Sequence, residues 1–292
     1  SRKYSLRALP AFLIIPSFPQ TPLILWCVAI HKFSFSPAGL HSFRSDNLSV
    51  RMKGVPAVMR ASMVVEAPRN LRLRVANPVT GGEAVDIGSN EEKFWAWIKD
   101  SPQRNVITCS HDHVSIASKV CPMPLPFRPD WLMEVLGVVP ISGSGYEVHR
   151  DKPKSPVVEL VSVQRTPDQH PIKRIVKINT VYGVVVEHRV ESLDGKMIAK
   201  ATLFEHFRDQ KTQLIMPKVI NIDWPVDGQP IALSLEFNSV DFNSPAESVA
   251  MWSPPEMSDY PDDLIGTWQV KDELGGKTLG TSTVVFKAEG EV

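Results

Sequence analysis

Most of the chain after residue 43 consists of short runs in which polar and apolar residues alternate. Residues 71–75, Leu-Arg-Leu-Arg-Val, place leucine and valine on one face and arginine on the other. This alternation predicts β-strands with one buried and one solvated face, as in antiparallel meanders. We expect strands at 48–53, 58–66, 71–75, 83–87, 105–109, 157–163, 172–179, 184–190, 197–208, 218–224 and 231–237. Short turns between them predict an up-and-down antiparallel sheet of roughly nine to eleven strands, large enough to curl.

Two tryptophan-rich segments interrupt this pattern and predict amphipathic helices. In residues 89–99, Ser89 and Glu92 form a capping-box pattern, and Phe94, Trp97 and Ile98 share the i, i+3, i+4 spacing of one helix face. Residues 128–137 begin with a proline in the first turn and end at Gly137, a suitable C′ residue. A shorter helix is expected at 110–120. Helices of this kind usually lie across one face of a sheet, above either a packed core or a cavity.

The charge balance bears on the class of partner. Lys and Arg total 32, Asp and Glu total 32, and the formal net charge is zero. Nucleic-acid-binding proteins usually carry a basic excess, so we expect no nucleic-acid partner. The 25 prolines suit an all-β protein with many turns better than a helical bundle.

Residues 1–42 are expected to lie outside the fold. Arg2, Lys3 and Arg7 precede an apolar stretch at 8–30, a pattern typical of an export signal, but four prolines break it. The residues around Cys27 resemble a bacterial lipobox, although Trp26 is too bulky for that signal. The segment is therefore either a signal-like leader, with or without a membrane anchor, or sequence that does not belong to the fold.

Residues 261–292 predict one further hairpin after a main domain at 43–260. Gly266-Thr267-Trp268 resembles the opening G-x-W of lipocalin-like small barrels, but two strands are too few to close a barrel. We interpret the segment as a partial lipocalin-like hairpin or a docked tail.

Residues 86–98 and 127–137 together resemble envelope lipoproteins of the planctomycete type, which are similar in layout to the LolA/LolB lipoprotein-carrier family. The resemblance covers roughly residues 47–260. It implies a mainly β fold with α: a curved antiparallel half-barrel sheet covered by a helical lid, with acyl chains held between sheet and helices. It also implies a location in the periplasm or cell envelope. The residues that would line such a site are Phe94, Trp95, Trp97, Ile98, Trp131, Leu132, Val135 and Leu136.

The expected function is therefore non-catalytic binding of apolar acyl chains, from a lipid or a lipoprotein, in the bacterial cell envelope. The alternative is an envelope scaffold or sensor module with a filled core, which acts through contacts with an envelope protein partner. No hydrolase elbow, zinc-protease, P-loop or dinucleotide-binding motif is present, so we predict no enzyme, no catalytic residues and no cofactor.

Three other groups of residues are candidate sites. Cys109, His111, His113 and Cys121 carry zinc-ligand chemistry but not the spacing of a zinc finger, so solvent-facing histidines at a helix start are favoured over a metal site. Glu187-His188 and Glu205-His206 are strand neighbours whose side chains point to opposite faces, which prevents direct acid–base pairing. Strand faces bearing Arg51, Lys53, Arg72 and Arg74 could contact anionic head groups, but a solvated outer face is the simpler interpretation.

Overall fold

The computed structural model describes residues 39–99, 106–111, 129–141, 145–166, 169–225, 230–244 and 248–255, together with the backbone of 266–274 and 277–286. Residues 1–38 of the expected leader, most of the expected helix at 110–120, and the side chains of the C-terminal hairpin lie outside the described residues. The predicted end of the leader at residue 42 is wrong, because Leu40 belongs to the main core and Ser42 begins the first strand.

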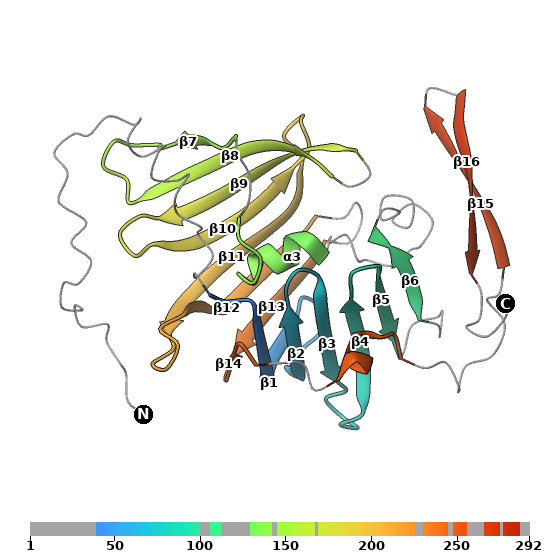
Figure 1. Cartoon of the computed structure of the whole chain (residues 1–292), viewed down its shortest axis with the longest axis horizontal. Helices are drawn as coiled ribbons and strands as arrows, with labels where there is room; N and C mark the ends of the chain where they lie inside the picture. Colours follow the sequence, from blue (N-terminus) through green and yellow to red (C-terminus); the bar gives the residue numbers. More distant parts are fainter. Residues whose placement is uncertain are drawn as a thin grey trace. The chain divides into compact units, whose positions relative to one another are not determined.

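One open, 14-stranded antiparallel sheet dominates the described residues (Figure 1). Its strands are β1 (Ser42–Met52), β2 (Met59–Glu66), β3 (Asn70–Ala76), β4 (Glu83–Ser89), β5 (Lys93–Ile98), β6 (Ile107–Ser110), β7 (Glu147–His149), β8 (Val157–Arg165), β9 (Pro171–Asn179), β10 (Val184–Glu191), β11 (Met197–Arg208), β12 (Ile215–Trp224), β13 (Ile231–Phe237) and β14 (Asp241–Phe242). The strand order is β6-β5-β4-β3-β2-β1-β13-β12-β11-β10-β9-β8-β7, with β14 beside β1. The sheet is thus two meanders joined where β1 pairs with β13, and β6 and β7 form its two ends.

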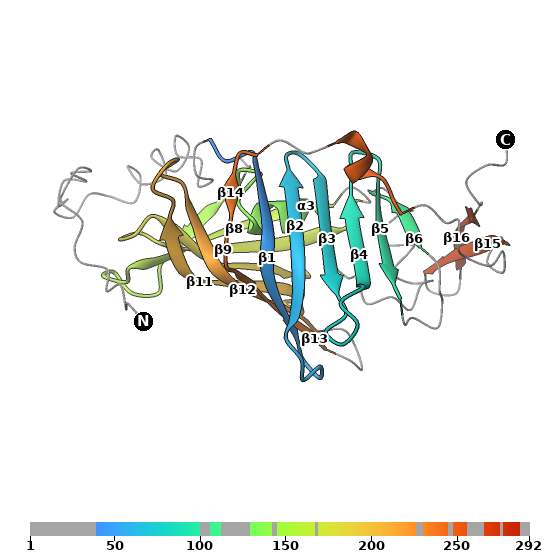
Figure 2. The same cartoon turned by 90° about the horizontal axis from the view of Figure 1, so that it is seen from below.

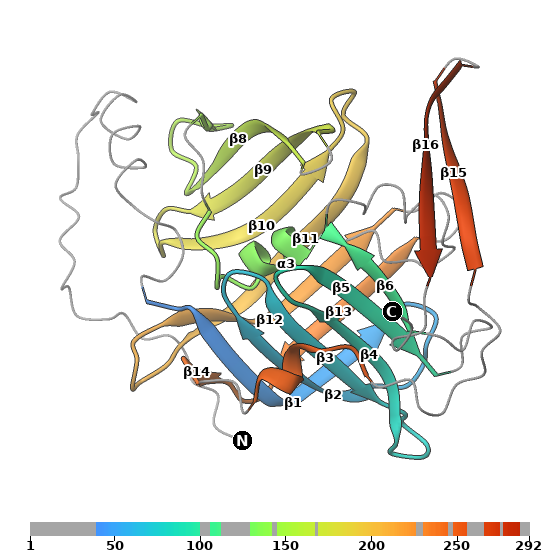
Figure 3. The same cartoon turned by 45° about the vertical axis from the view of Figure 1, so that its right-hand side comes forward.

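The helix α3 (Pro129–Val135) lies between the two meanders, which bend so that both face it (Figures 1 and 3). Figure 2 shows the first meander, β1 to β6, running side by side from the joint. The main hydrophobic core contains residues of β1, β2, β3, α3, β10, β11, β12 and β13. We call the face of the sheet that carries this core the inner face, and the opposite one the outer face.

The alternation of the sequence explains which side chains the inner face buries. In β3, Leu71, Leu73 and Val75 belong to the core, whereas Arg72 and Arg74 point to the outer face. In the second meander, cross-strand ion pairs cover the outer face, such as Lys177 with Glu159 at 3.0 Å and Lys173 with Glu191 at 3.5 Å. The predicted curved antiparallel sheet is confirmed.

The helix predicted at 89–99 is wrong: this segment is a β-hairpin of β4 and β5. No helix begins at Ser89. Instead, Oδ1 of Asn90 accepts hydrogen bonds from the backbone N–H groups of Glu92 and Lys93, both at 2.9 Å. An asparagine side chain that bonds two residues onward makes a turn, and this turn reverses the chain between the strands. The residues that follow, Phe-Trp-Ala-Trp-Ile, are mostly of the aromatic and β-branched types that suit a strand.

The second predicted helix is confirmed as α3, with Pro129 as its first residue. Gly137 has a φ of 79°, which an L side chain rarely adopts. Its N–H donates to the Glu134 carbonyl at 3.0 Å, and the Val138 N–H donates to the Met133 carbonyl at 3.2 Å. These two bonds make a Schellman motif, which ends the helix. Among the described residues, α3 alone represents the expected helical lid.

Two further elements follow the main sheet. The short 3-10 helix η2 (Val249–Trp252) contacts β3. The strands β15 (Gly266–Leu274) and β16 (Lys277–Phe286) pair with each other in a separate two-stranded sheet. The hairpin expected near the C-terminus is therefore present as backbone structure.

Candidate functional site

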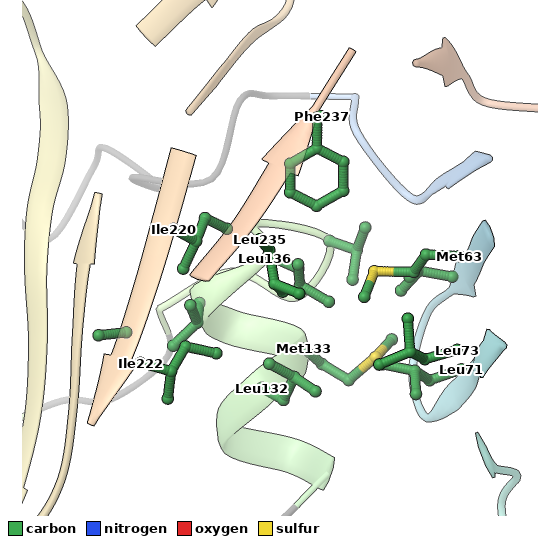
Figure 4. Close-up of a cluster of buried hydrophobic side chains, with 14 of the residues drawn as sticks. Met63, Leu71, Leu73, Leu132, Met133, Leu136, Ile220, Ile222, Leu235 and Phe237 are labelled. Carbon is green, nitrogen blue, oxygen red and sulfur yellow. The ribbon is translucent and has the colours of Figure 1, made fainter. Parts of the chain in front are cut away.

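The inner face is closed by the apolar side of α3. Trp131, Leu132, Met133, Val135 and Leu136 are between 0 and 7% exposed, and all belong to the main core. Figure 4 shows Leu132, Met133 and Leu136 between Met63, Leu71 and Leu73 of the first meander and Ile220, Ile222, Leu235 and Phe237 of β12 and β13. A helix of only seven residues thus fills the space between the two halves of the sheet.

The expected acyl-site residues divide between the two faces. Trp131, Leu132, Val135 and Leu136 lie together in the core. Phe94 and Ile98 share the inner face, because they stand in register with Ser89 and Val85, which pair with Leu71 and Val75. Trp95 and Trp97 pair with Gly88 and Asp86 and point to the outer face. The structure therefore does not bring those two indoles near α3, since alternation in a strand separates them from Phe94 and Ile98.

Trp95 is fully buried on the outer face, in a cluster with Arg72 and Asp86. The Arg72 guanidinium binds the Asp86 carboxylate through two nitrogens, at 3.1 and 2.6 Å, and lies 5.8 Å from the Trp95 ring centre. Its third nitrogen donates to the Met251 carbonyl at 2.8 Å. Trp252 is 9% exposed, and its carbonyl accepts from Asn90 Nδ2 at 3.0 Å.

Residues 248–255, which we call the strap, thus cover this part of the outer face. The expectation of a solvated outer face is wrong for Arg72, which is 6% exposed, because a segment 179 residues away lies over it. It holds for Arg74, whose side chain is 49% exposed.

The expectation of a solvent-facing histidine is also wrong for His111, which is 4% exposed. Its Nε2 lies 2.8 Å from the Asn90 carbonyl, and its ring centre lies 6.2 Å from that of Phe94. The described residues contain no group of three or more potential metal ligands, while His113 and Cys121 lie outside them.

Two ion pairs tie α3 to the sheet, one to each meander. Arg69, in the β2–β3 turn, binds Asp130 at 2.7 and 3.3 Å. Arg174 of β9 binds Glu134 in a very close contact. An open depression of about 540 Å³ lies beside α3 and is lined by Pro68, Arg69, Glu91, Asp130, Glu134 and Val139. The side of the helix that carries Asp130 and Glu134 is therefore polar and borders an opening, whereas its opposite side is deep in the core.

The pair of Glu134 and Arg174 is desolvated, with side chains that are each 10% exposed. Burial raises the pKa of the Glu134 carboxyl, and the guanidinium opposes that change. Burial alone would lower the pKa of Arg174, but the hydrogen bond and charge of Glu134 outweigh it and raise that pKa. Each group thus depends on the other to remain charged away from water.

A chain of polar groups, all buried except the half-buried Gln164, continues from Arg174 across the inner face of the second meander. Its Nη1 donates to Gln164 Oε1 at 2.9 Å, and Gln164 Nε2 donates to the Ser162 hydroxyl at 3.2 Å. His188 lies on the same face, opposite Ala201 of the core. Burial, followed by the positive charge of Arg174, lowers the pKa of His188 to about 3.

Two atoms of this region lack hydrogen-bond partners within the described part of the chain: His188 Nδ1 and the Tyr146 hydroxyl, both buried. Tyr146 directly precedes Glu147, which pairs with Val161, and the next residue, Ser162, pairs with Arg174, so Tyr146 lies at the same end of this strand group as Arg174. We call Glu134, Arg174, Gln164, Ser162, His188 and Tyr146 the polar cluster.

The polar cluster was missed from the sequence, although the prediction that neighbouring side chains point to opposite faces is correct for its histidine. Glu187 lies on the outer face, 3.6 Å from Lys177, while His188 is buried on the inner face. The register of the structure brings a histidine and an arginine to inner-face positions of adjacent strands, since His188 pairs with Val176 and Arg174 pairs with Val190.

Comparisons with known proteins add similarities of fold. A LolA superfamily protein from Nitrosomonas europaea is 13% identical with a TM-score of 0.47; the match covers 75% of this chain and 94% of that protein. A putative outer membrane lipoprotein-sorting protein domain from Vibrio parahaemolyticus is 10% identical with a TM-score of 0.49, over 78% and 95% of the two chains. No family model and no curated protein matches the sequence. In the described residues, no helix is long and apolar enough to cross a membrane.

Proposed function

We propose that this protein binds apolar acyl chains, without chemistry, in the cell envelope, and that a chain enters by taking the place of α3 on the inner face of the sheet. The observation that carries this proposal is the position of α3. A single seven-residue helix supplies the apolar side chains that fill the space between the two meanders.

A helix of this length is well suited to being displaced. Isolated helices shorter than roughly 12–15 residues are marginal in water, so α3 is held by its contacts with the sheet rather than by its own stability. An acyl chain that replaces those contacts gains about 0.8 kcal/mol for each buried CH₂ group. A chain of roughly sixteen carbons therefore offers a gain comparable to the burial of several large side chains of the helix, at about 1.5–3 kcal/mol each.

The rival function is a scaffold or sensor with a filled core that acts through an envelope protein partner. The close packing of α3 favours it, because Met133 is 0% and Leu136 is 1% exposed. The two functions differ in one property: only the first requires α3 to leave the sheet when an apolar chain is offered.

Delipidated protein titrated with a fluorescent fatty acid, together with native mass spectrometry for co-purified lipid, tests the proposal. Val135→Ala, in α3, should weaken the hold of the helix on the sheet and so tighten acyl binding several-fold. Val64→Ala removes the same two methyl groups from a buried side chain on the outer face, and should leave acyl binding unchanged. Absence of both uptake and co-purified lipid would refute acyl binding and favour the scaffold.

A further inference from the structure

The polar cluster raises a question that acyl binding alone does not answer, namely why a site for hydrocarbon would contain a buried arginine. Arg174 is 8% exposed and stands on the inner face in register with Val190, a core residue. A buried charge is costly unless it is paired, and here its partner comes from α3. If α3 leaves, Arg174 must find another anion.

The helix presents two kinds of chemistry to the sheet at once. Leu132, Val135 and Leu136 give it an apolar surface, and Glu134 adds a carboxylate that binds the guanidinium. A long hydrocarbon chain that ends in a carboxylate has the same two parts.

On this basis, and resting on the proposed function, we propose that the ligand is a long-chain fatty acid whose carboxylate binds Arg174 in the place that Glu134 occupies when the site is closed. Glu134 is then a built-in competitor, and Arg174 is the residue that selects free acids over esters.

The surroundings of Arg174 fit an incoming carboxylate. Arginine binds carboxylates through two parallel N–H bonds, and the two carboxylate oxygens can accept further hydrogen bonds. The Tyr146 hydroxyl and His188 Nδ1 are buried polar atoms that lack a partner within the described ranges. The Tyr146 hydroxyl can donate a hydrogen bond to an anion. The His188 imidazole can do the same in the tautomer that carries its proton on Nδ1. Two unmatched groups beside a buried guanidinium indicate a place for one more polar ligand.

The site can also be reached from solvent. Glu134 lines the open depression beside α3, so the ion pair borders an opening rather than lying under the whole core. Next to Arg174 and Ser162 on the same face lie Val176, Ile178, Leu160 and Val158, each 1 or 2% exposed. A head group held at Arg174 would therefore have apolar surface on the sheet beside it as well as under α3.

The test compares a fluorescent fatty acid, cis-parinaric acid, with its methyl ester at pH 8. The native protein should bind the acid about tenfold more tightly than the ester, because only the acid offers a charged hydrogen bond to the guanidinium. Glu134→Gln removes the competing charge and should tighten binding of the acid more than that of the ester. Combined with Glu134→Gln, Arg174→Gln should abolish the preference while ester binding remains, which shows that this variant is folded.

Asp130→Asn is the matched control, because it weakens the other ion pair of α3 while Arg174 stays occupied. It should leave the preference for the acid unchanged. Equal binding of acid and ester by both the native protein and Glu134→Gln would overturn the role of Arg174 but leave acyl binding intact. Failure of every variant to bind either probe would overturn the proposed function itself. If the double variant does not fold, the comparison of native protein with Glu134→Gln decides alone.

Discussion

Replacing Arg72 with methionine tests whether the outer face of the first meander is truly covered. Arg72→Met keeps the apolar stem of the side chain but removes both bonds to Asp86, at 2.6 and 3.1 Å, and the bond to the Met251 carbonyl at 2.8 Å. Asp86 is 1% exposed, so it would be left as a buried charge, with the Trp95 N–H at 3.4 Å and the more distant Arg74 at 3.7 Å still near it. Removing one partner of a buried pair costs about 3–5 kcal/mol.

Arg74→Met is the matched control, two residues along the same strand and on the same face. Its side chain is 49% exposed and its ion pairs are long, at 3.5 and 3.7 Å, so its loss should cost less than about 1 kcal/mol. Urea unfolding followed by circular dichroism measures both free energies. A cost below about 1 kcal/mol for Arg72→Met, or one equal to that of the control, would refute the covered face and its buried pair.

Two further predictions concern stability. A Cβ at Gly88 would lie 2.0 Å from Trp95 Cζ2, so Gly88→Ala should destabilise the protein by about 1–3 kcal/mol in urea unfolding. Gly82→Ala is the control and should have little effect, because its Cβ would lie 3.7 Å from the nearest atom. Equal effects of the two substitutions would contradict the packing of Trp95 over Gly88. The pKa of His188 is about 3 in the folded protein and about 6.5 in the unfolded chain. Below pH 6.5 the unfolded chain therefore binds a proton that the folded protein does not, so the free energy of unfolding decreases as the pH falls. Between pH 7.5 and pH 5 this residue should account for a loss of about 2 kcal/mol, which His188→Leu should remove; an unchanged pH dependence in that variant would show that His188 is not buried in its neutral form.

The sheet was predictable because its signal is local. Strand alternation has a period of two, and the run Leu-Arg-Leu-Arg-Val sorts itself onto two faces before any partner is known. The stop signal of α3 is equally local, since Gly137 can adopt the backbone conformation that the Schellman motif requires. The pairing of β1 with β13 was not predictable, because no short turn joins these strands.

The errors arose where a local signal had two meanings or where the decisive partner was remote. Ser-Asn-Glu-Glu at 89–92 fits a helix cap, but the same residues make a turn once Asn90 accepts the N–H groups of Glu92 and Lys93. The burial of Arg72 depends on the strap, whose Met251 lies 179 residues away. Arg174 could not be placed on the inner face from sequence, because its strand has apolar residues on both faces there: Ile175 and Val176 are both buried.

Hydrogen exchange of the α3 backbone, with and without a saturating long-chain fatty acid, tests the central claim most directly. The Leu136, Gly137 and Val138 amides donate to carbonyls of Leu132, Glu134 and Met133 in the closed state. If the acyl chain takes the place of α3, protection of these amides should fall on binding while that of β12 and β13 is kept or rises. Binding that leaves α3 as protected as before, or more so, would contradict the displacement of the helix.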